Sequence, residues 1–352
     1  MAKFWLNSLF ILRGVKKPSD VIVLEASMQD TIEKIFSVKN FDYNRTEPCI
    51  VRETDHWAVV YKPPHLPTAP LRADERNTLV YWFLHSPEVQ KQSAEYGLCS
   101  REAQVRGKKE IEAGLLHRLD TDTRGLVLFA KDQAVYDFLA ARQEAGQMIK
   151  TYCAFVEPSL SRAMEYKGYS FNAMELATLK ELSAVQRGGA ARERIAAQEV
   201  VAAQLPLTLE SQFRNFGPGA KKVAPVFPGS RHYKKDGRLY TTVIEAADIL
   251  LSPIDGNDTV TQTACESRPS PLLIRVRCRL SRGYRHQVRA HLATAGLPIV
   301  GDPLYAPQGA EAQPESAQVG LQLYAVSLEF PDLENPRQSI RVALPLPDKM
   351  NP

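Results

Sequence analysis

The sequence lacks the features that mark several common classes of protein. Its 352 residues include five cysteines, which are scattered and never spaced as C-x-x-C. This pattern argues against a structural zinc site or a disulfide framework and fits a reducing compartment. No metal-ligand spacing, P-loop or dinucleotide fingerprint occurs, so we expect no metal and no cofactor. The sequence therefore predicts a cytoplasmic protein whose chemistry comes from its own side chains.

Long hydrophobic runs are also absent. The apolar stretch within residues 1–15 is too short for a membrane span and is interrupted by Asn7 and Ser8. We interpret it as a packed N-terminal element, with a cleaved signal peptide as the alternative. We expect no membrane association.

Neither positive nor negative charge is in large excess. The net charge is +4 and the isoelectric point is near 8.7, with 24% charged and 44% hydrophobic residues. These values are ordinary for a globular protein, and they permit a polyanionic partner without requiring one. The length allows one large domain or two modest ones. Basic residues gather in two segments: Arg101, Arg106, Lys108 and Lys109, and Arg275, Arg277, Arg279, Arg282, Arg285 and Arg289.

Hydrophobic periodicity and turn residues predict a mixture of strands and helices. Strands are expected at 49–51, 57–61, 150–156, 241–245, 273–280 and 321–330, and helices at 30–38, 78–84, 132–143 and 174–203. Three prolines predict an extended segment at 62–67, and residues 215–222 have the composition of a turn. Because the elements show no repeated βαβ order, we predict an α+β fold with a mainly antiparallel sheet.

Residues 273–280 alternate between apolar and cationic side chains. Ile274, Val276, Cys278 and Leu280 alternate with Arg275, Arg277 and Arg279. In a strand this places one face in the core and a cationic face opposite. A solvated charged face is the ordinary interpretation of the arginines, and contact with the phosphates of a nucleic acid is the alternative, as for the Lys108–Lys109 loop.

The most informative segment is His117-Arg118-Leu119-Asp120, which is followed closely by the apolar run 126–130. Polar groups held against a buried element are costly unless they are paired or used. Two roles are open for Asp120. It caps the N-terminus of a helix, which is an ordinary role of an aspartate, or it is a catalytic group. The stretch HRLDTDTRGLVLFAK resembles the HRLD signature of the pseudouridine synthases that modify large-subunit ribosomal RNA and some transfer RNAs, and in that family the aspartate is catalytic.

Four further segments resemble motifs of the same family, in the same order. Residues 55–66 resemble its K-P strand and loop, although Pro64-His65 replaces the usual small residue and glycine. Residues 150–152 match K-x-Y. Residues 283–291 resemble G-R-x-H-Q-[IL]-R-x-H, and 297–305 match P-[IL]-x-G-D-x-x-Y. The third segment departs from the pattern at Tyr284-Arg285, where relatives have arginine and then a small residue.

The resemblance implies that the chain isomerises specific uridines to pseudouridine in structured RNA, either ribosomal RNA or transfer RNA, and needs no redox change or energy input. It implies that Asp120 attacks C1′ or removes a proton from C2′, that Arg289 pairs with it, and that Tyr152 packs against the base. It also implies that Arg118 enters the space left by the flipped nucleotide. The implied catalytic residues are Asp120, Tyr152 and Arg289, and the implied substrate-binding residues are Arg118, His117, Lys150, Arg285, His286 and Gln287.

The roles within the second group differ. His117, His286 and Gln287 are expected to be framework hydrogen-bonding groups. Lys150 is expected either to contact a phosphate or to pair with an acid. Arg285 is a candidate to supply the positive charge that relatives have at the position of Tyr284. Outside this set, Gly125 is expected to allow a close backbone approach or a positive φ, and Asp302 to form a turn.

The implied fold is the pseudouridine synthase catalytic domain, a mainly antiparallel mixed sheet with flanking helices and a central RNA-binding cleft. We expect it to span residues 46–344, with an accessory insertion at 158–238, an N-terminal extension of unknown role at 1–45, and a tail at 345–352. The protein is expected to act as a monomer.

Two other functions are consistent with parts of the sequence. The first is a catalytically silent RNA-binding or ribosome-assembly factor with the same fold, which the presence of Asp120, Tyr152 and Arg289 disfavours. The second is a glycoside hydrolase, which needs a second carboxylate such as Asp122.

Overall fold

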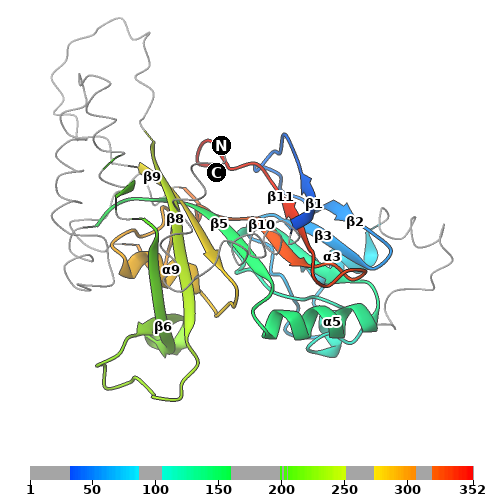
Figure 1. Ribbon diagram of the computed structural model, residues 1–352, viewed down its shortest axis with the longest axis horizontal. Helices are drawn as coiled ribbons and strands as arrows, with labels where there is room; N and C mark the ends of the chain where they lie inside the picture. Colours follow the sequence, from blue (N-terminus) through cyan, green and yellow to red (C-terminus); the bar gives the residue numbers. More distant parts are fainter. Residues whose placement is uncertain are drawn as a thin grey trace, which may run out of the picture.

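The computed structural model describes residues 32–86, 105–159, 199, 202–203, 205–250, 273–306 and 319–351 (Figure 1). The expected N-terminal packed element and nearly all of the helix expected at 174–203 lie outside these residues.

One mixed sheet organises the described part of the chain. Its strands follow the order β2-β3-β4-β10-β5-β9-β8-β6-β7, and β11 pairs with both β10 and β1. Among the described strands, the pairs β1–β11 and β4–β10 are parallel and the other pairs are antiparallel. The predicted α+β, mainly antiparallel fold is therefore confirmed. The strands are β1 (Ile32–Ser37), β2 (Cys49–Glu53), β3 (Trp57–Lys62), β4 (Arg124–Ala130), β5 (Ile149–Val156), β6 (Leu207–Phe216), β7 (Lys222–Val226), β8 (Tyr240–Leu250), β9 (Leu273–Leu280), β10 (Leu323–Pro331) and β11 (Ser339–Ala343).

The helices have conventional ends. Thr78 caps α3 (Leu79–His85) and Asp132 caps α5 (Gln133–Glu144), each through a side-chain oxygen that accepts from a backbone N–H in the first turn. The other helical elements are α9 (Gln287–Thr294) and the short 3-10 turns η2 (Glu110–Glu112) and η3 (Pro218–Ala220). No helix in the described ranges is long and apolar enough to cross a membrane.

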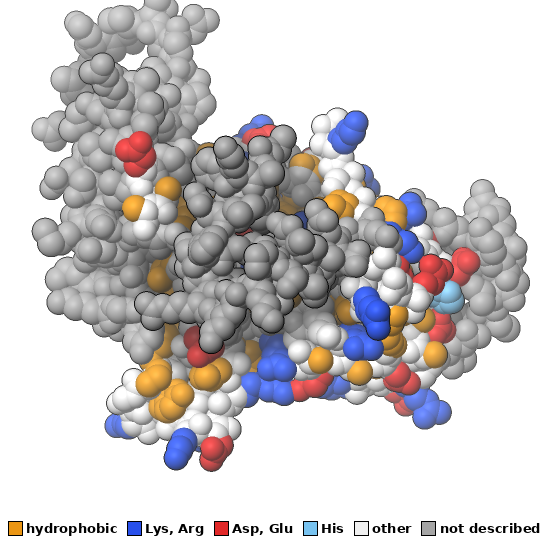
Figure 2. All heavy atoms as spheres, viewed as in Figure 1, with side chains coloured by type: hydrophobic (Ala, Val, Ile, Leu, Met, Phe, Trp, Pro, Cys, Tyr) orange, Lys and Arg blue, Asp and Glu red, His pale blue; other side chains and the backbone are white. Residues whose placement is uncertain are grey.

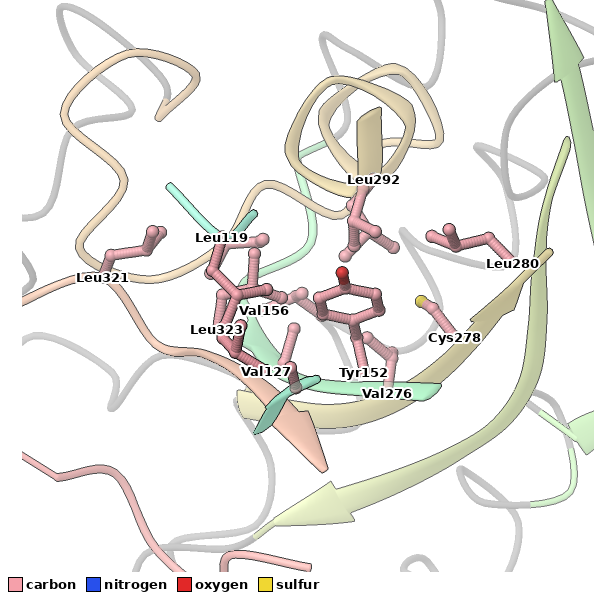
Figure 3. Packing of buried hydrophobic residues seen from close by; sticks show 14 of the residues in the cluster. Leu119, Val127, Tyr152, Val156, Val276, Cys278, Leu280, Leu292, Leu321 and Leu323 are labelled. Carbon is pink, nitrogen blue, oxygen red and sulfur yellow. The ribbon is translucent and has the colours of Figure 1, made fainter. Parts of the chain in front are cut away.

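The sheet has a hydrophobic core on each face. On one face, α3 and α9 pack over a cluster that includes Tyr152, Cys278 and Leu292 (Figure 3). On the other face, α5 packs with Tyr43 and Phe330 in a second cluster. The first core matters for function because Tyr152 extends from it toward α9.

The helix predicted at 30–38 is wrong, because residues 32–37 form strand β1. Its parallel partner β11 supplies the hydrogen bonds that a helix would make internally. Burial follows a period of two, since Ile35 is 57% exposed whereas Phe36 packs against the core. Tyr43 is buried as well, so the described part of the expected N-terminal extension belongs to the same sheet and core.

The segment expected to be extended at 62–67 contains a turn at Pro64-His65. His65 has φ of 61°, in the left-handed region that glycine adopts without strain. The residue that replaces the usual glycine thus keeps the backbone conformation of a glycine.

The arginine strand β9 alternates as predicted, with the apolar side chains buried and the arginines on the opposite face. Arg275 pairs with Asp248, and Arg277 and Arg279 pair with Glu245. These arginines are neutralised within the protein and face away from the core that holds Tyr152, which favours the solvated-face interpretation over phosphate contact.

Candidate active site

A cleft of about 860 Å³ opens between the loop before β4, strand β5 and the N-terminal end of α9. All nine residues singled out in the sequence line it: His117, Arg118, Asp120, Lys150, Tyr152, Arg285, His286, Gln287 and Arg289. They come from three segments separated by up to 169 positions. The tertiary structure therefore brings the predicted site residues into one place.

Asp120 and Arg289 form the central ion pair. The Arg289 Nη1 donates to Asp120 Oδ2 at 2.9 Å, as expected for this pair. The Arg289 side chain is 4% exposed, whereas that of Asp120 is 25% exposed. The arginine is thus fixed inside the protein, and the carboxylate faces the cleft.

Asp302 holds the other side of the same guanidinium. Its two oxygens accept from Nε and Nη2 of Arg289, each at 2.8 Å. Burial alone lowers the pKa of Arg289, but Asp302 and Asp120 outweigh it and raise that pKa above its ordinary value. The Asp302 Oδ1 also accepts from the backbone N–H of Leu304 and Tyr305. Asp302 is therefore the turn former that was expected and, in addition, orients Arg289.

The loop that carries Asp120 is attached to the segment after β3. The Thr68 hydroxyl donates to the Leu119 carbonyl at 2.7 Å and accepts from the Leu119 N–H at 3.1 Å. Lys62, which is fully buried, donates at 2.8 Å to the carbonyls of Pro63, Leu66 and Thr121. Burial lowers the pKa of Lys62 to about 7, and the three carbonyls can all be satisfied only by the ammonium form. No role was predicted for Lys62 from the sequence, although its position as the lysine of the K-P motif could have indicated one.

Tyr152 lies on β5 opposite Cys278, and its hydroxyl points toward α9 (Figure 3). Its side chain is 9% exposed and lines the cleft. Burial, together with the negative charge of Asp120, raises the pKa of Tyr152 well above 10. The phenol is therefore neutral near pH 7 and presents an aromatic ring to whatever enters the cleft.

His286 and Gln287 shape the start of α9. His286 has φ of 57°, and its Nδ1 lies 3.2 Å from the Tyr305 hydroxyl. Its Nε2 is 3.8 Å from Asp120 Oδ2, and burial lowers the pKa of the imidazole despite this carboxylate. Gln287 accepts from the Tyr284 N–H and donates to Thr241 and Thr242. Both side chains make the framework contacts that were expected.

His117 is buried, and its Nε2 accepts from the Leu128 N–H at 3.3 Å. Burial, with a contribution from the charge of Lys150, lowers the pKa of His117 well below 6.5, so the ring is neutral. Arg118, in contrast, has a side chain that is 57% exposed and lies 3.7 Å from Glu112. The histidine holds the loop, whereas the arginine is available at the cleft surface.

Lys150 is buried beside the cleft and is 5% exposed. Its Nζ donates to Gln143 Oε1 at 3.4 Å, and no ion pair joins it to a carboxylate in the described residues. Burial lowers the pKa of Lys150 to about 8. A cation placed in this way is suited to an anion that enters the cleft.

The departure at Tyr284-Arg285 has a structural explanation. Tyr284 stacks on Phe213 of β6, with ring centroids 5.0 Å apart and planes within 6°. The Arg285 Nη2 contacts Asn215 Oδ1 at 3.2 Å and also donates to the Ala220 carbonyl. Arg285 lines the cleft, but its guanidinium also secures the turn between β6 and β7.

Asp122, the second carboxylate that a glycoside hydrolase would need, is not among the residues that line the cleft. It pairs instead with His65 Nδ1 at 3.1 Å on the surface. In the described part of the chain, no group of three or more histidine, cysteine or acidic side chains is placed to hold a metal ion. The cleft brings Asp120, Arg289 and Tyr152 together, and its other carboxylates are those of Glu75, Glu112 and Glu144.

The family model described as RNA pseudouridylate synthase matches residues 56–294, which is more than half of the chain. The chain belongs to this family. Its mixed, mainly antiparallel sheet with few helices is the pseudouridine synthase fold, as the resemblance predicted.

Individual relatives and solved structures are similar to this chain at low sequence identity. The chain is 22% identical over 311 residues to ribosomal large subunit pseudouridine synthase D of Pseudomonas aeruginosa, which covers 85% of this chain and 68% of that protein. It is 32% identical over 95 residues to RNA pseudouridine synthase 5 of Arabidopsis thaliana, covering 20% and 26% of the two chains. The solved structure of human RNA pseudouridylate synthase domain containing 4 has a TM-score of 0.46 and 17% identity, and covers 85% of this chain and 88% of its own.

Proposed function

We propose that the protein isomerises specific uridines to pseudouridine in a structured ribosomal or transfer RNA. The observation that carries this proposal is the Asp120–Arg289 ion pair at the floor of a cleft that Tyr152 also lines. The isomerisation breaks the bond between N1 of uracil and C1′ and forms a bond between C5 and C1′, while C5 loses its proton and N1 gains one. Because the reaction is redox-neutral and needs no energy input, one well-placed carboxylate is chemically sufficient.

Asp120 acts as the nucleophile or the base, either by attack on C1′ or by removal of the C2′ proton. Arg289 orients the carboxylate, because the guanidinium is itself fixed by Asp302. Tyr152 packs its neutral ring against the uracil and holds the base while it turns between bond breakage and bond formation.

The remaining residues bind the substrate. Arg118 is exposed beside Asp120 and replaces the target nucleotide in its stack when that nucleotide flips into the cleft. Lys150 attracts a backbone phosphate, since no carboxylate neutralises it in the described chain. His117, His286 and Gln287 keep the walls of the cleft in place.

We further propose that the catalytic unit comprises residues 46–344 together with 32–45, which the sheet and its core include, with an accessory insertion at 158–238, and that the protein works as a monomer in the cytoplasm. The family match within this span supports the first point. The free thiols of Cys153 and Cys278 are consistent with a reducing compartment.

The test is the variant Asp120→Asn, compared with Asp122→Asn as a matched control two positions away. Transcripts of transfer RNA and of large-subunit ribosomal RNA are incubated with each protein, and pseudouridine is quantified by mass spectrometry. Asp120→Asn should abolish product formation and leave the melting temperature and RNA binding nearly unchanged, and Asp122→Asn should remain active. Pseudouridine mapping in total RNA from cells with and without the gene then identifies the target position.

Two outcomes would contradict the proposal. Full activity of Asp120→Asn would show that the Asp120 carboxylate is not needed for the reaction. RNA binding by the wild-type protein without product on any cellular RNA would favour the catalytically silent RNA-binding factor.

A further inference from the structure

Residues 214–238, which we call the basic arm, hold most of the excess positive charge of the chain. The arm comprises the end of β6, η3, β7 and the connection to β8, and it projects at the lower left of Figure 1. It has seven lysines and arginines and one acidic residue, a net charge of +6, whereas the whole chain carries +4. The rest of the protein therefore has a net charge of about −2, although lysine and arginine side chains also lie elsewhere on the face drawn in Figure 2. The basic residues are Arg214, Lys221, Lys222, Arg231, Lys234, Lys235 and Arg238.

Most of these charges are not neutralised by the protein. Lys221, Arg231, Lys234 and Lys235 are exposed. Within the described ranges, none of these four forms an ion pair with a carboxylate, in contrast to the three arginines of β9, which all do. Like charges held this close together repel one another unless a polyanion neutralises them.

The base of the arm is fixed to the segment that begins α9. Tyr284 stacks on Phe213, and Arg285 contacts Asn215 and donates to the Ala220 carbonyl. The Tyr305 hydroxyl accepts from the Val223 N–H at 2.8 Å. Tyr284 and Arg285 directly precede His286 and line the cleft. The arm therefore has a defined position relative to Asp120.

The other end of the arm returns to the opposite wall of the same cleft. Arg238 pairs with Glu144 at the end of α5, and Glu144 lines the cleft. The Gln212 side chain bonds both the N–H and the carbonyl of Lys234, so the backbone is ordered while the lysine side chain stays exposed. Both ends of the cationic segment thus border the cleft.

We infer that the basic arm binds the sugar–phosphate backbone of the RNA outside the nucleotide that enters the cleft. This inference rests on the proposed function. Phosphates are the polyanion that must lie beside the cleft when a nucleotide of a structured RNA is flipped into it. Lysine and arginine contacts to phosphate give affinity and a strong salt dependence without reading sequence. The arm therefore supplies affinity and position, and the cleft supplies the chemistry.

The test compares two double variants that remove the same charge from different faces: Lys234→Gln with Lys235→Gln on the arm, and Arg277→Gln with Arg279→Gln on the paired arginine strand. Fluorescence anisotropy measures the binding of labelled transfer RNA and of large-subunit ribosomal RNA stem-loops over a series of KCl concentrations. The arm variant should lose affinity, and its slope of log K against log salt should become shallower by about 1.5 for two phosphate contacts. The strand variant should bind like the wild type.

Equal salt slopes for the arm variant and the wild type would overturn the inference and leave the proposed function intact. A wild-type protein that binds neither RNA would overturn both. The two failures are therefore distinguishable in one experiment.

Discussion

Arg289 and Asp302 form a two-point ion pair that is buried behind the Asp120 carboxylate. Two guanidinium nitrogens bind the two oxygens of Asp302 at 2.8 Å, which leaves Nη1 for Asp120. The Asp302 side chain is 0% exposed, and Arg289 is its ion-pair partner inside the protein. The orientation of the Asp120 carboxylate is thus set by a residue that does not line the cleft.

The variant Asp302→Ala should be much less stable than Asp120→Ala. Removing Asp302 leaves a buried guanidinium without its main partner, which costs about 3–5 kcal/mol of unfolding free energy. Asp120 is partly exposed, so its removal should cost much less. Urea denaturation of the two variants measures the difference. Asp302→Asn, which keeps an oxygen for the turn, should recover part of the stability and little of the activity, and equal stabilities of the two alanine variants would contradict this account.

The affinity for RNA should depend on pH through Lys150. Burial lowers the pKa of Lys150 to about 8, so the side chain is charged below that pH and neutral above it. A phosphate binds the charged form, and the affinity should therefore fall as the pH rises from about 7 to about 9. Lys150→Arg keeps its charge throughout and should lack this dependence, measured by anisotropy at constant salt. The same pH dependence in both proteins would assign the effect to another group.

Gly125 should not tolerate even alanine. Its φ is 133°, and an added Cβ would lie 2.3 Å from the Ala325 carbonyl oxygen and 2.5 Å from the Ala325 nitrogen. We expect Gly125→Ala to cost on the order of 3 kcal/mol or to prevent folding, because the backbones of β4 and β10 would have to separate. Gly229→Ala is the control, since Gly229 also has positive φ but has no atom within 4 Å of the added carbon. Denaturation curves that shift equally for the two variants would be inconsistent with this packing.

His65→Gly should leave the protein at least as stable as the wild type, with a gain of up to about 1 kcal/mol from the relief of left-handed strain. The surface pair between His65 and Asp122 contributes little in return. His65→Ala keeps the unfavourable φ and loses the pair, so its melting temperature should fall. Calorimetry of both variants checks the sign, and a clear loss of stability in His65→Gly would show that the imidazole itself holds the loop.

Local signals in the sequence were sufficient for much of the fold. The apolar spacing after Asp132 predicted α5, and alternation predicted β9 with its arginine face. Residues 32–37 were predicted wrongly, because Ile32, Ile35 and Phe36 fit a helix as well as a strand. The strand forms because β11, which lies about 300 positions away, offers backbone hydrogen bonds that no local pattern contains.

For the site, the sequence by itself determined the residue types and their order. The motifs around Asp120, Tyr152 and Arg289 predicted the family, and Gly125 was expected to serve a close approach or a positive φ. These features are local, since each depends on a short run of residues with fixed spacing.

The tertiary structure alone decided how these groups act together. It placed Arg289 between two carboxylates and buried Lys62 beneath the Asp120 loop. It also gave each arginine of β9 a carboxylate partner, and within the described residues it left four exposed basic residues of the arm without an ion pair. The physical reason is that burial and charge pairing depend on distances between segments far apart in the chain. A sequence specifies which groups are present, but only packing fixes which of them meet and which of them water or a ligand can reach.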